Sequence, residues 1–258
     1  MIRPAVRLAA AVLLGLAPPA AAQDDADRQM FIDANLLATY YHELGHALID
    51  VAQAPVLGRE EDAADALSTL LIHEIWEPES ATGMLRATAA AWLWSDAEAA
   101  EEGLEPAYWD VHSLDLQRYY TQVCLFYGAD PEARAELAQE LELPEERAEG
   151  CEAEYALAAD SWDAMLAGLT EGGEGRLVLL HSTADQGDDA GETADLAGYI
   201  ALIAEEVADF NRDYQLPVDV EVAFESCGEA NAFYDPETRR ISLCTEYIDD
   251  MGALWDAN

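Results

Sequence analysis

The residues with the clearest chemical potential lie in the stretch HELGH at positions 42–46. If this stretch is helical, His42 and His46 lie on one face, because they are four residues apart. Two imidazoles at this spacing can bind one metal ion, and zinc accepts nitrogen ligands in a tetrahedral shell. The carboxylate of Glu43 is then placed to take a proton from a water on the metal. The alternative, coincidence on an amphipathic helix, is disfavoured because the chain has only five histidines.

A catalytic zinc normally has three protein ligands and one water. The best source of a third ligand is the run EDAAD at residues 61–65, where Glu61 and Asp65 would share one face of a helix. Glu61 has the length and position to reach the metal, so we expect it to be the ligand. Asp65 lies one turn deeper and is expected to hold a ligand imidazole in place. Asp50 is a second candidate for such support and an outside rival as ligand. Without the two histidines, Glu61 and Asp65 would be ordinary acids at a helix N-terminus.

His112 is a candidate for a further catalytic role. It could donate a hydrogen bond to the oxyanion that develops during attack on a carbonyl, and Tyr119 could do the same. The alternative for His112 is a helix-capping or packing role, which is the more frequent one for an isolated histidine.

The elements that must position these groups are helices. Apolar residues recur at helical spacing from Phe31 to Ile49, no proline interrupts residues 24–54, and Pro55 follows as a stop. Gly45 lies inside this helix, where a glycine costs about 1 kcal/mol relative to alanine. We therefore expect a compensating close approach of a second helix or of substrate.

The rest of the chain is predicted to be largely helical, with strands near the C-terminus. Helices are expected over residues 59–76, 81–100, 117–127, 131–140, 144–169 and 196–214. Gly128 fits the C-cap of the helix over residues 117–127, and Pro55 with Gly58 lets the chain reverse before the helix over residues 59–76. Strands are expected over residues 177–180 and 218–222, and a β-hairpin over residues 231–244. The predicted class is α+β, mostly helical with a small antiparallel sheet or hairpin.

The first 22 residues have the character of a signal peptide. Arg3 and Arg7 form a basic start, residues 8–16 are apolar, and residues 20–22 are alanines suited to a cleavage site. We therefore expect residues 23–258 to form one mature domain that is secreted or periplasmic, with no membrane association after cleavage.

Four cysteines, an even number, agree with export to an oxidising compartment. Three pairings are possible, and short loops favour Cys124–Cys151 and Cys227–Cys244. A zinc site built from them is disfavoured, because none are two or three residues apart.

The charge is strongly acidic. Asp and Glu number 53 against 12 basic residues, and the formal net charge is −41. Such a surface repels nucleic acid and anionic lipid, which excludes both as partners. It is compatible with salt-rich surroundings or cationic substrates, although a solvated acidic surface is the simpler interpretation.

The sequence resembles the gluzincin class of metallopeptidases, in which a Glu on a later helix completes an HExxH site; Glu61 belongs to an ExxAD motif of that kind. It also resembles a bacterial family of metallopeptidases of unknown function. The resemblance lies in residues 42–50, 55–71, 112–128, 143–155 and 227–244. It implies a zincin-like fold, although here the predicted strands follow the HExxH helix, whereas in most zincins the sheet precedes it.

The leading hypothesis is a zinc-dependent metallopeptidase that hydrolyses a peptide or protein, with Glu43 as general base. A second hypothesis is a non-catalytic, zinc-stapled periplasmic binding protein. A structural zinc is usually enclosed by four protein ligands, whereas only three are identified here. A third, an acidic cation-binding protein, is disfavoured because the sequence has no EF-hand loop.

Overall fold

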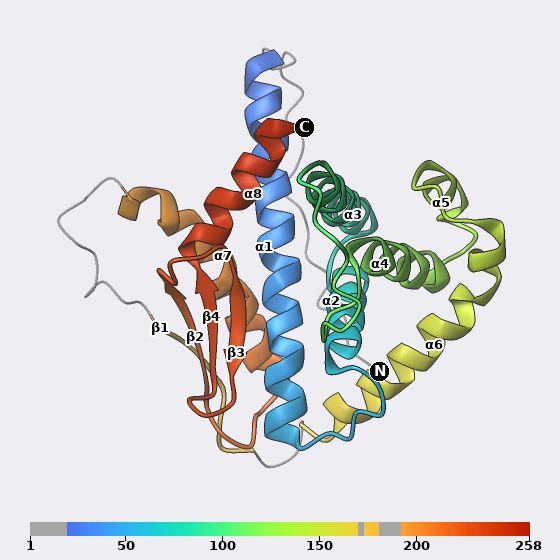
Figure 1. The fold of residues 1–258 in the computed structure, drawn as a ribbon. Coiled ribbons are helices and arrows are strands. Elements are labelled where there is room, and N and C mark those ends of the chain that lie inside the picture. The colour runs from blue at the N-terminus through green and yellow to red at the C-terminus, as the bar shows by residue number, and fades with distance from the viewer. Residues whose placement is uncertain (1–19, 170–172, 181–191) are drawn as a thin grey trace, which may run out of the picture.

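The computed structural model describes residues 20–169, 173–180 and 192–258. Its central element is helix α1 (Ala20–Ala52), which stands between a sheet on one side and a group of helices on the other (Figure 1). Apolar side chains along α1, including Phe31, Leu36 and Leu48, are almost completely buried. The predicted apolar period is therefore confirmed, and α1 contributes to the core along most of its length.

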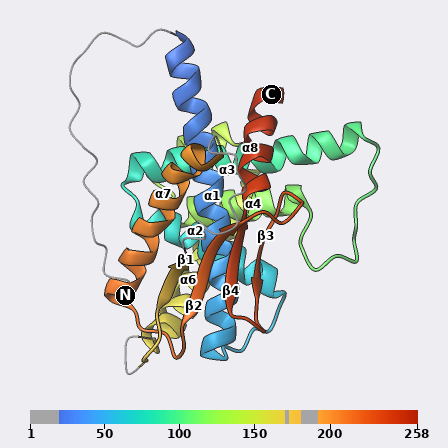
Figure 2. The same cartoon turned by 90° about the vertical axis from the view of Figure 1, so that its left-hand side faces the viewer.

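The helices beside α1 follow the sequence predictions closely. Proline or glycine precedes several of them, and Pro78 is the first residue of α3, where its missing N–H costs nothing. These helices are α2 (Glu60–Ile75), α3 (Pro78–Glu101), α4 (Asp115–Ala129), α5 (Ala135–Glu140) and α6 (Glu145–Ala167). The long connection between α3 and α4 projects from the body of the protein (Figure 2).

The sheet has four strands in the order β1-β2-β4-β3. They are β1 (Leu177–Leu180), β2 (Val220–Glu225), β3 (Ala232–Asp235) and β4 (Arg240–Cys244). Only the β3–β4 hairpin is antiparallel, whereas β1–β2 and β2–β4 are parallel. The expected small antiparallel sheet is thus a mixed sheet. The reason is α7 (Glu192–Asp213), which connects β1 to β2, because a crossover helix allows parallel pairing.

Helix α8 (Thr245–Ala257) was not expected from the sequence. Its apolar residues Ile248, Met251 and Leu254 are buried in the same core as the sheet and α1. In the N-terminal half of α1, the ring of Phe31 packs against the ring of Trp255 from α8, with 5.4 Å between the ring centroids. The protein is therefore mostly helical α+β, as predicted, with α8 added to the layer beside α1.

Two glycines mark places where helices approach closely. A Cβ at Gly45 would lie 3.0 Å from the Cα of Ala64, so α2 packs directly against the HELGH turn of α1. This is the close approach that the glycine predicted. Gly128 was expected to cap the C-terminus of a helix, but α4 continues through it to Ala129. A Cβ at Gly128 would overlap the carbonyl of Cys151 in α6, so that glycine also permits close helix packing.

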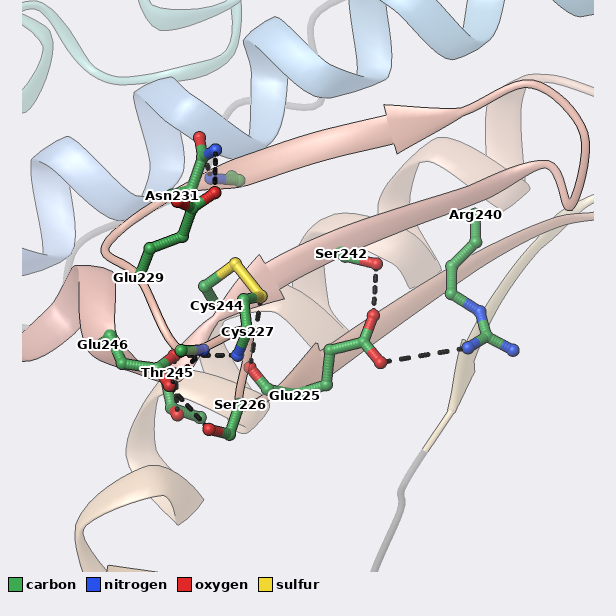
Figure 3. Close-up of a disulfide and its surroundings, with 12 residues drawn as sticks. Glu225, Ser226, Cys227, Glu229, Asn231, Arg240, Ser242, Cys244, Thr245 and Glu246 are labelled. Carbon is green, nitrogen blue, oxygen red and sulfur yellow. Dashed lines mark hydrogen bonds and ion pairs between the residues drawn. A yellow bond between two sulfur atoms is a disulfide. The ribbon is translucent and has the colours of Figure 1, made fainter.

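The four cysteines have the pairing that short loops favoured. Cys124 and Cys151 join α4 to α6, and Cys227 and Cys244 join the segment before β3 to the end of β4. Beside the second pair, Glu246 accepts hydrogen bonds from Ser226 and from the backbone N–H groups of residues 227 and 228 (Figure 3). This end of the hairpin is thus held by a disulfide and by a buttressing carboxylate.

Residues 1–19 of the expected signal peptide lie outside the described residues, and α1 begins at Ala20, inside the expected leader. Among the residues that the structure describes, no helix has both the length and the apolar character needed to cross a membrane.

Candidate metal centre

Three possible metal ligands converge where α1 faces the start of α2. The Nε2 atoms of His42 and His46 lie 3.1 Å apart, and each lies 3.2 Å from Oε2 of Glu61. One ligand atom from each residue falls within a mutual distance of 4.8 Å. The helical spacing provides the two imidazoles. The reversal between α1 and α2 brings Glu61 back to them.

The other nitrogen of each imidazole is held by a carboxylate. Nδ1 of His42 lies 2.8 Å from Oδ1 of Asp65, and Nδ1 of His46 lies 2.8 Å from Oε1 of Glu60. Because an ionised carboxylate can only accept, Nδ1 donates in both pairs, and the Nε2 atoms, which face Glu61, become lone-pair donors once a metal replaces their protons. Two imidazole lone pairs and a carboxylate oxygen are the donor set that zinc binds. These residues therefore fit a divalent metal.

The electrostatics of the cluster favour a cation. Burial lowers the pKa of His42, but hydrogen bonds to Asp65 and Glu61 outweigh it and raise that pKa to about 9. Hydrogen bonds to His42 and His46 hold the pKa of Glu61 below its usual range. Burial alone would raise the pKa of Asp65, yet His42 and Arg118 lower it to about 2. The carboxylates thus stay ionised and attract positive charge to this point.

Glu43 is buried beside the ligands, with 6% of its surface exposed. Burial raises the pKa of its carboxyl group, which His42, His46 and a hydrogen bond from the backbone N–H of Tyr234 partly offset. A carboxylate with a raised pKa next to a metal ion is suited to accepting a proton and returning it.

His112 reaches the same cluster from the connection between α3 and α4. Its Nε2 lies 3.1 Å from Oε2 of Glu61, and its Nδ1 lies 2.9 Å from Oδ1 of Asp110. The segment is fastened to the start of α2, because Ser113 donates to Asp62 at 2.8 Å. About half of the His112 side chain is exposed. It is therefore the one of these three imidazoles that faces solvent most.

Two other candidates lie away from the metal ligands. Asp50 accepts a hydrogen bond from the Tyr234 hydroxyl at 2.8 Å, so its carboxylate is used by the sheet rather than by a ligand imidazole. Tyr119 donates to the carbonyl of Leu141 at 2.6 Å, which directs its hydroxyl into a different part of the helical layer.

Sequence reasoning missed three supporting residues, namely Glu60, Asp110 and Arg118. Glu60 belongs to an acidic run whose members look alike in sequence. Arg118 donates to both oxygens of Asp65, at 2.6 and 2.8 Å, across 53 positions of the chain. Only for Asp110 was there a signal, because it lies two residues before His112.

Two cavities meet at this cluster, and His42, Glu43, His112 and Ala232 line both. The larger cavity, of about 770 Å³, extends past His46 and strand β3. The smaller one, of about 310 Å³, extends between α1, α2, α3, α4 and α8. The candidate metal centre thus lies between two cavities, and a bound peptide could occupy both.

Comparison with known proteins agrees with this geometry. The family described as "Putative metallopeptidase" matches residues 18–166 and 190–258. No curated protein and no solved structure matches the chain, so the zincin-like fold stays a prediction from the motif. The matched residues include the two histidines, Glu43, Glu61 and the hairpin, and they cover most of the chain. This protein belongs to that metallopeptidase family.

Proposed function

We propose that this protein is a zinc-dependent metallopeptidase that hydrolyses peptide bonds in a peptide or protein substrate. The observation that carries the proposal is the convergence of His42, His46 and Glu61, with a buried Glu43 beside them. Three protein ligands leave a fourth position open, which distinguishes catalytic from structural zinc sites. A zinc ion held there would polarise the scissile carbonyl and lower the pKa of a water toward about 7.

Glu43 has the role of general base in this proposal. Its carboxylate accepts a proton from the attacking water as the new carbon–oxygen bond forms. It then passes that proton to the amide nitrogen as the carbon–nitrogen bond breaks, so the products are a carboxylate and an amine. The raised pKa of Glu43 favours the first transfer, because it makes the carboxylate a stronger base toward the water.

His112 is proposed to stabilise the oxyanion. With Nδ1 paired to Asp110, Nε2 of His112 faces the space beside Glu61, where it would donate to the oxyanion. The exposure of His112 lets it contact a substrate that occupies either cavity.

The second candidate function, a non-catalytic binding protein stapled by zinc, is favoured by one observation about the same residue. His112 lies close enough to Glu61 to serve as a fourth ligand after a small movement. A closed site of four protein ligands would be structural. The two functions therefore differ in what His112 does.

We further propose that the protein is secreted or periplasmic. The expected signal peptide supports this location, and so do two disulfides, which persist in oxidising compartments.

Metal removal and restoration test the function. We expect the mature protein to contain about one zinc per chain and to cleave members of a peptide mixture. A chelator should abolish cleavage, and added zinc should restore it. A protein that contains no zinc after growth in zinc-replete medium, or whose cleavage is unaffected by a chelator, would refute the proposal.

A further inference from the structure

We propose that the smaller cavity beside Glu43 binds a long, positively charged side chain of the substrate, that of lysine or arginine. This assignment rests on the proposed peptidase function of the neighbouring centre, because the substrate chain must pass the metal ligands. It follows from the length of the cavity along α1, from the hydrogen-bonding groups on its wall and from one unpaired carboxylate.

The cavity extends along α1. Asn35, Thr39 and Glu43 line it on successive turns of the helix, which span about 12 Å at 1.5 Å per residue. Its volume of about 310 Å³ exceeds that of any single side chain. A side chain that enters beside Glu43 therefore needs to be long to reach the other end.

Hydroxyl groups on the wall mostly present acceptors, because their hydrogens are already used inside the protein. Ser68 donates to the carbonyl of Ala38 at 2.8 Å, and Thr69 donates to the carbonyl of Asp65 at 3.1 Å. A hydroxyl that has donated its hydrogen retains two lone pairs. These positions can then only accept from a ligand.

The side-chain amides of Asn35 and Gln122 on the wall also use their N–H groups inside the protein. Asn35 donates from Nδ2 to the carbonyl of Phe31 at 2.9 Å, and Gln122 donates from Nε2 to Thr88 at 2.9 Å. Thr88 can only accept from Gln122, because its own hydrogen goes to a carbonyl of α3. The buried Oε1 of Gln122 has no partner among the described residues. Both amides therefore keep their oxygens for a hydrogen-bond donor.

The charges of the wall exclude an acidic side chain. Among the described residues, Arg118 is the only arginine that lines the cavity, and it is paired with both oxygens of Asp65 and stacked on Trp92 at 3.9 Å. Its charge is therefore already balanced by that of Asp65. Asp250 also lines the cavity, and no cation pairs with it in the described part of the chain. The unbalanced charge on this wall is negative.

Asp250 lies toward the end of the cavity that is remote from the metal ligands. Thr39 bonds to the Tyr247 hydroxyl at 2.9 Å, whereas Trp255 packs against Phe31, so α8 runs antiparallel to α1. Asp250 falls between these two contacts, near the level of Asn35. The aliphatic part of a lysine or arginine side chain would pass the uncharged residues of the wall, and its terminal cation would reach Asp250. An apolar side chain would instead leave the wall acceptors without donors.

Cleavage-site profiling tests the assignment with a matched pair of variants. The zinc-loaded protein is incubated with a peptide mixture, and the new termini are identified by mass spectrometry. We expect lysine and arginine to be enriched at one position next to the cleaved bond. Asp250→Arg should reduce cleavage at basic residues about tenfold and shift the preference toward Asp and Glu. Asp249→Arg, at a neighbour that is exposed like Asp250 but does not line the cavity, should leave the preference unchanged.

A binding experiment separates this inference from the proposed function. Arginine amide and the neutral citrulline amide are titrated calorimetrically into the zinc-loaded Glu43→Gln protein. We expect arginine amide to bind at least about tenfold more tightly, and Asp250→Arg to remove that difference. If peptides are cleaved with no basic preference, the cavity assignment is wrong and the peptidase stands. If arginine amide binds through Asp250 but no peptide is cleaved by the wild type, the peptidase is wrong and the cation site stands. Equal binding of the two amides overturns the assignment.

Discussion

Asp65 accepts a hydrogen bond from Nδ1 of His42 at 2.8 Å, and Arg118 donates to both oxygens of the same carboxylate. This pairing fixes both the orientation and the tautomer of His42, so that its Nε2 is directed at Glu61. Glu60 makes the equivalent contact with His46. Each helical ligand is thus supported by a carboxylate from the first turns of α2.

Substituting these carboxylates one at a time should show which one binds zinc and which one only orients a histidine. Glu61→Ala should lose zinc, because one of three ligands is gone, whereas Asp65→Ala should weaken zinc binding about 10–100-fold. Asp50→Ala is the matched control, since Asp50 pairs with Tyr234. Competition with a zinc chelator measures all three. If Glu61→Ala holds zinc as tightly as the wild type while Asp65→Ala or Asp50→Ala releases it, the ligand has been assigned to the wrong carboxylate.

His112→Ala distinguishes an oxyanion donor from a fourth ligand. We expect kcat to fall by about 10²–10³, the usual cost of removing one such donor, with zinc affinity nearly unchanged. A structural ligand would behave in the opposite way, because its loss would release zinc from a closed site. Parallel kinetics and chelator titration on this variant show which role His112 has, and a large loss of zinc would favour the stapled binding protein.

Gly45→Ala should destabilise the fold. The added methyl would meet Ala64 at 3.0 Å, so α1 and α2 would have to separate beside the metal ligands. We expect a loss of about 1–3 kcal/mol in the free energy of unfolding. Gly83→Ala, in the second turn of α3 with nothing within 4 Å, should instead stabilise by about 0.5–1 kcal/mol. Urea unfolding compares the pair, and equal effects would mean that the helices are not packed at Gly45.

The disulfides should be Cys124–Cys151 and Cys227–Cys244, which non-reducing peptide mapping can establish. Replacing Cys227 and Cys244 together by alanine should cost about 3 kcal/mol, since the bond closes a loop with a sequence separation of 17. The cost is measured by urea unfolding. Free thiols or crossed pairs in the map would contradict this connectivity.

The parts of the centre that follow from local periodicity could be predicted from the sequence. His42 and His46 are one helical turn apart, and Pro55 with Gly58 indicated the reversal that returns Glu61 to them. The contacts of Arg118 with Asp65 and of His112 with Glu61 depend on how distant helices pack. No local pattern specifies such contacts.

In the sheet, too, local features could be predicted from the sequence, whereas tertiary contacts could not. The strands were recognisable from a short apolar run, from alternating residues and from the turn of the hairpin, but the pairing of β1 with β2 depends on the path of α7 across the sheet. Gly128 was misassigned because a helix C-cap and a close helix approach both favour glycine. The contact with Cys151 that decides between them is tertiary.

The most direct test of the proposed peptidase compares the wild type with Glu43→Gln, both loaded with zinc, on one peptide mixture. The amide of glutamine fills the same space as the carboxylate but cannot accept a proton from water. We expect new peptide termini with the wild type, none above background with Glu43→Gln, and about one zinc per chain in both. Wild-type activity in Glu43→Gln, or a wild-type protein that holds zinc and cleaves nothing, would contradict a metallopeptidase with Glu43 as its base.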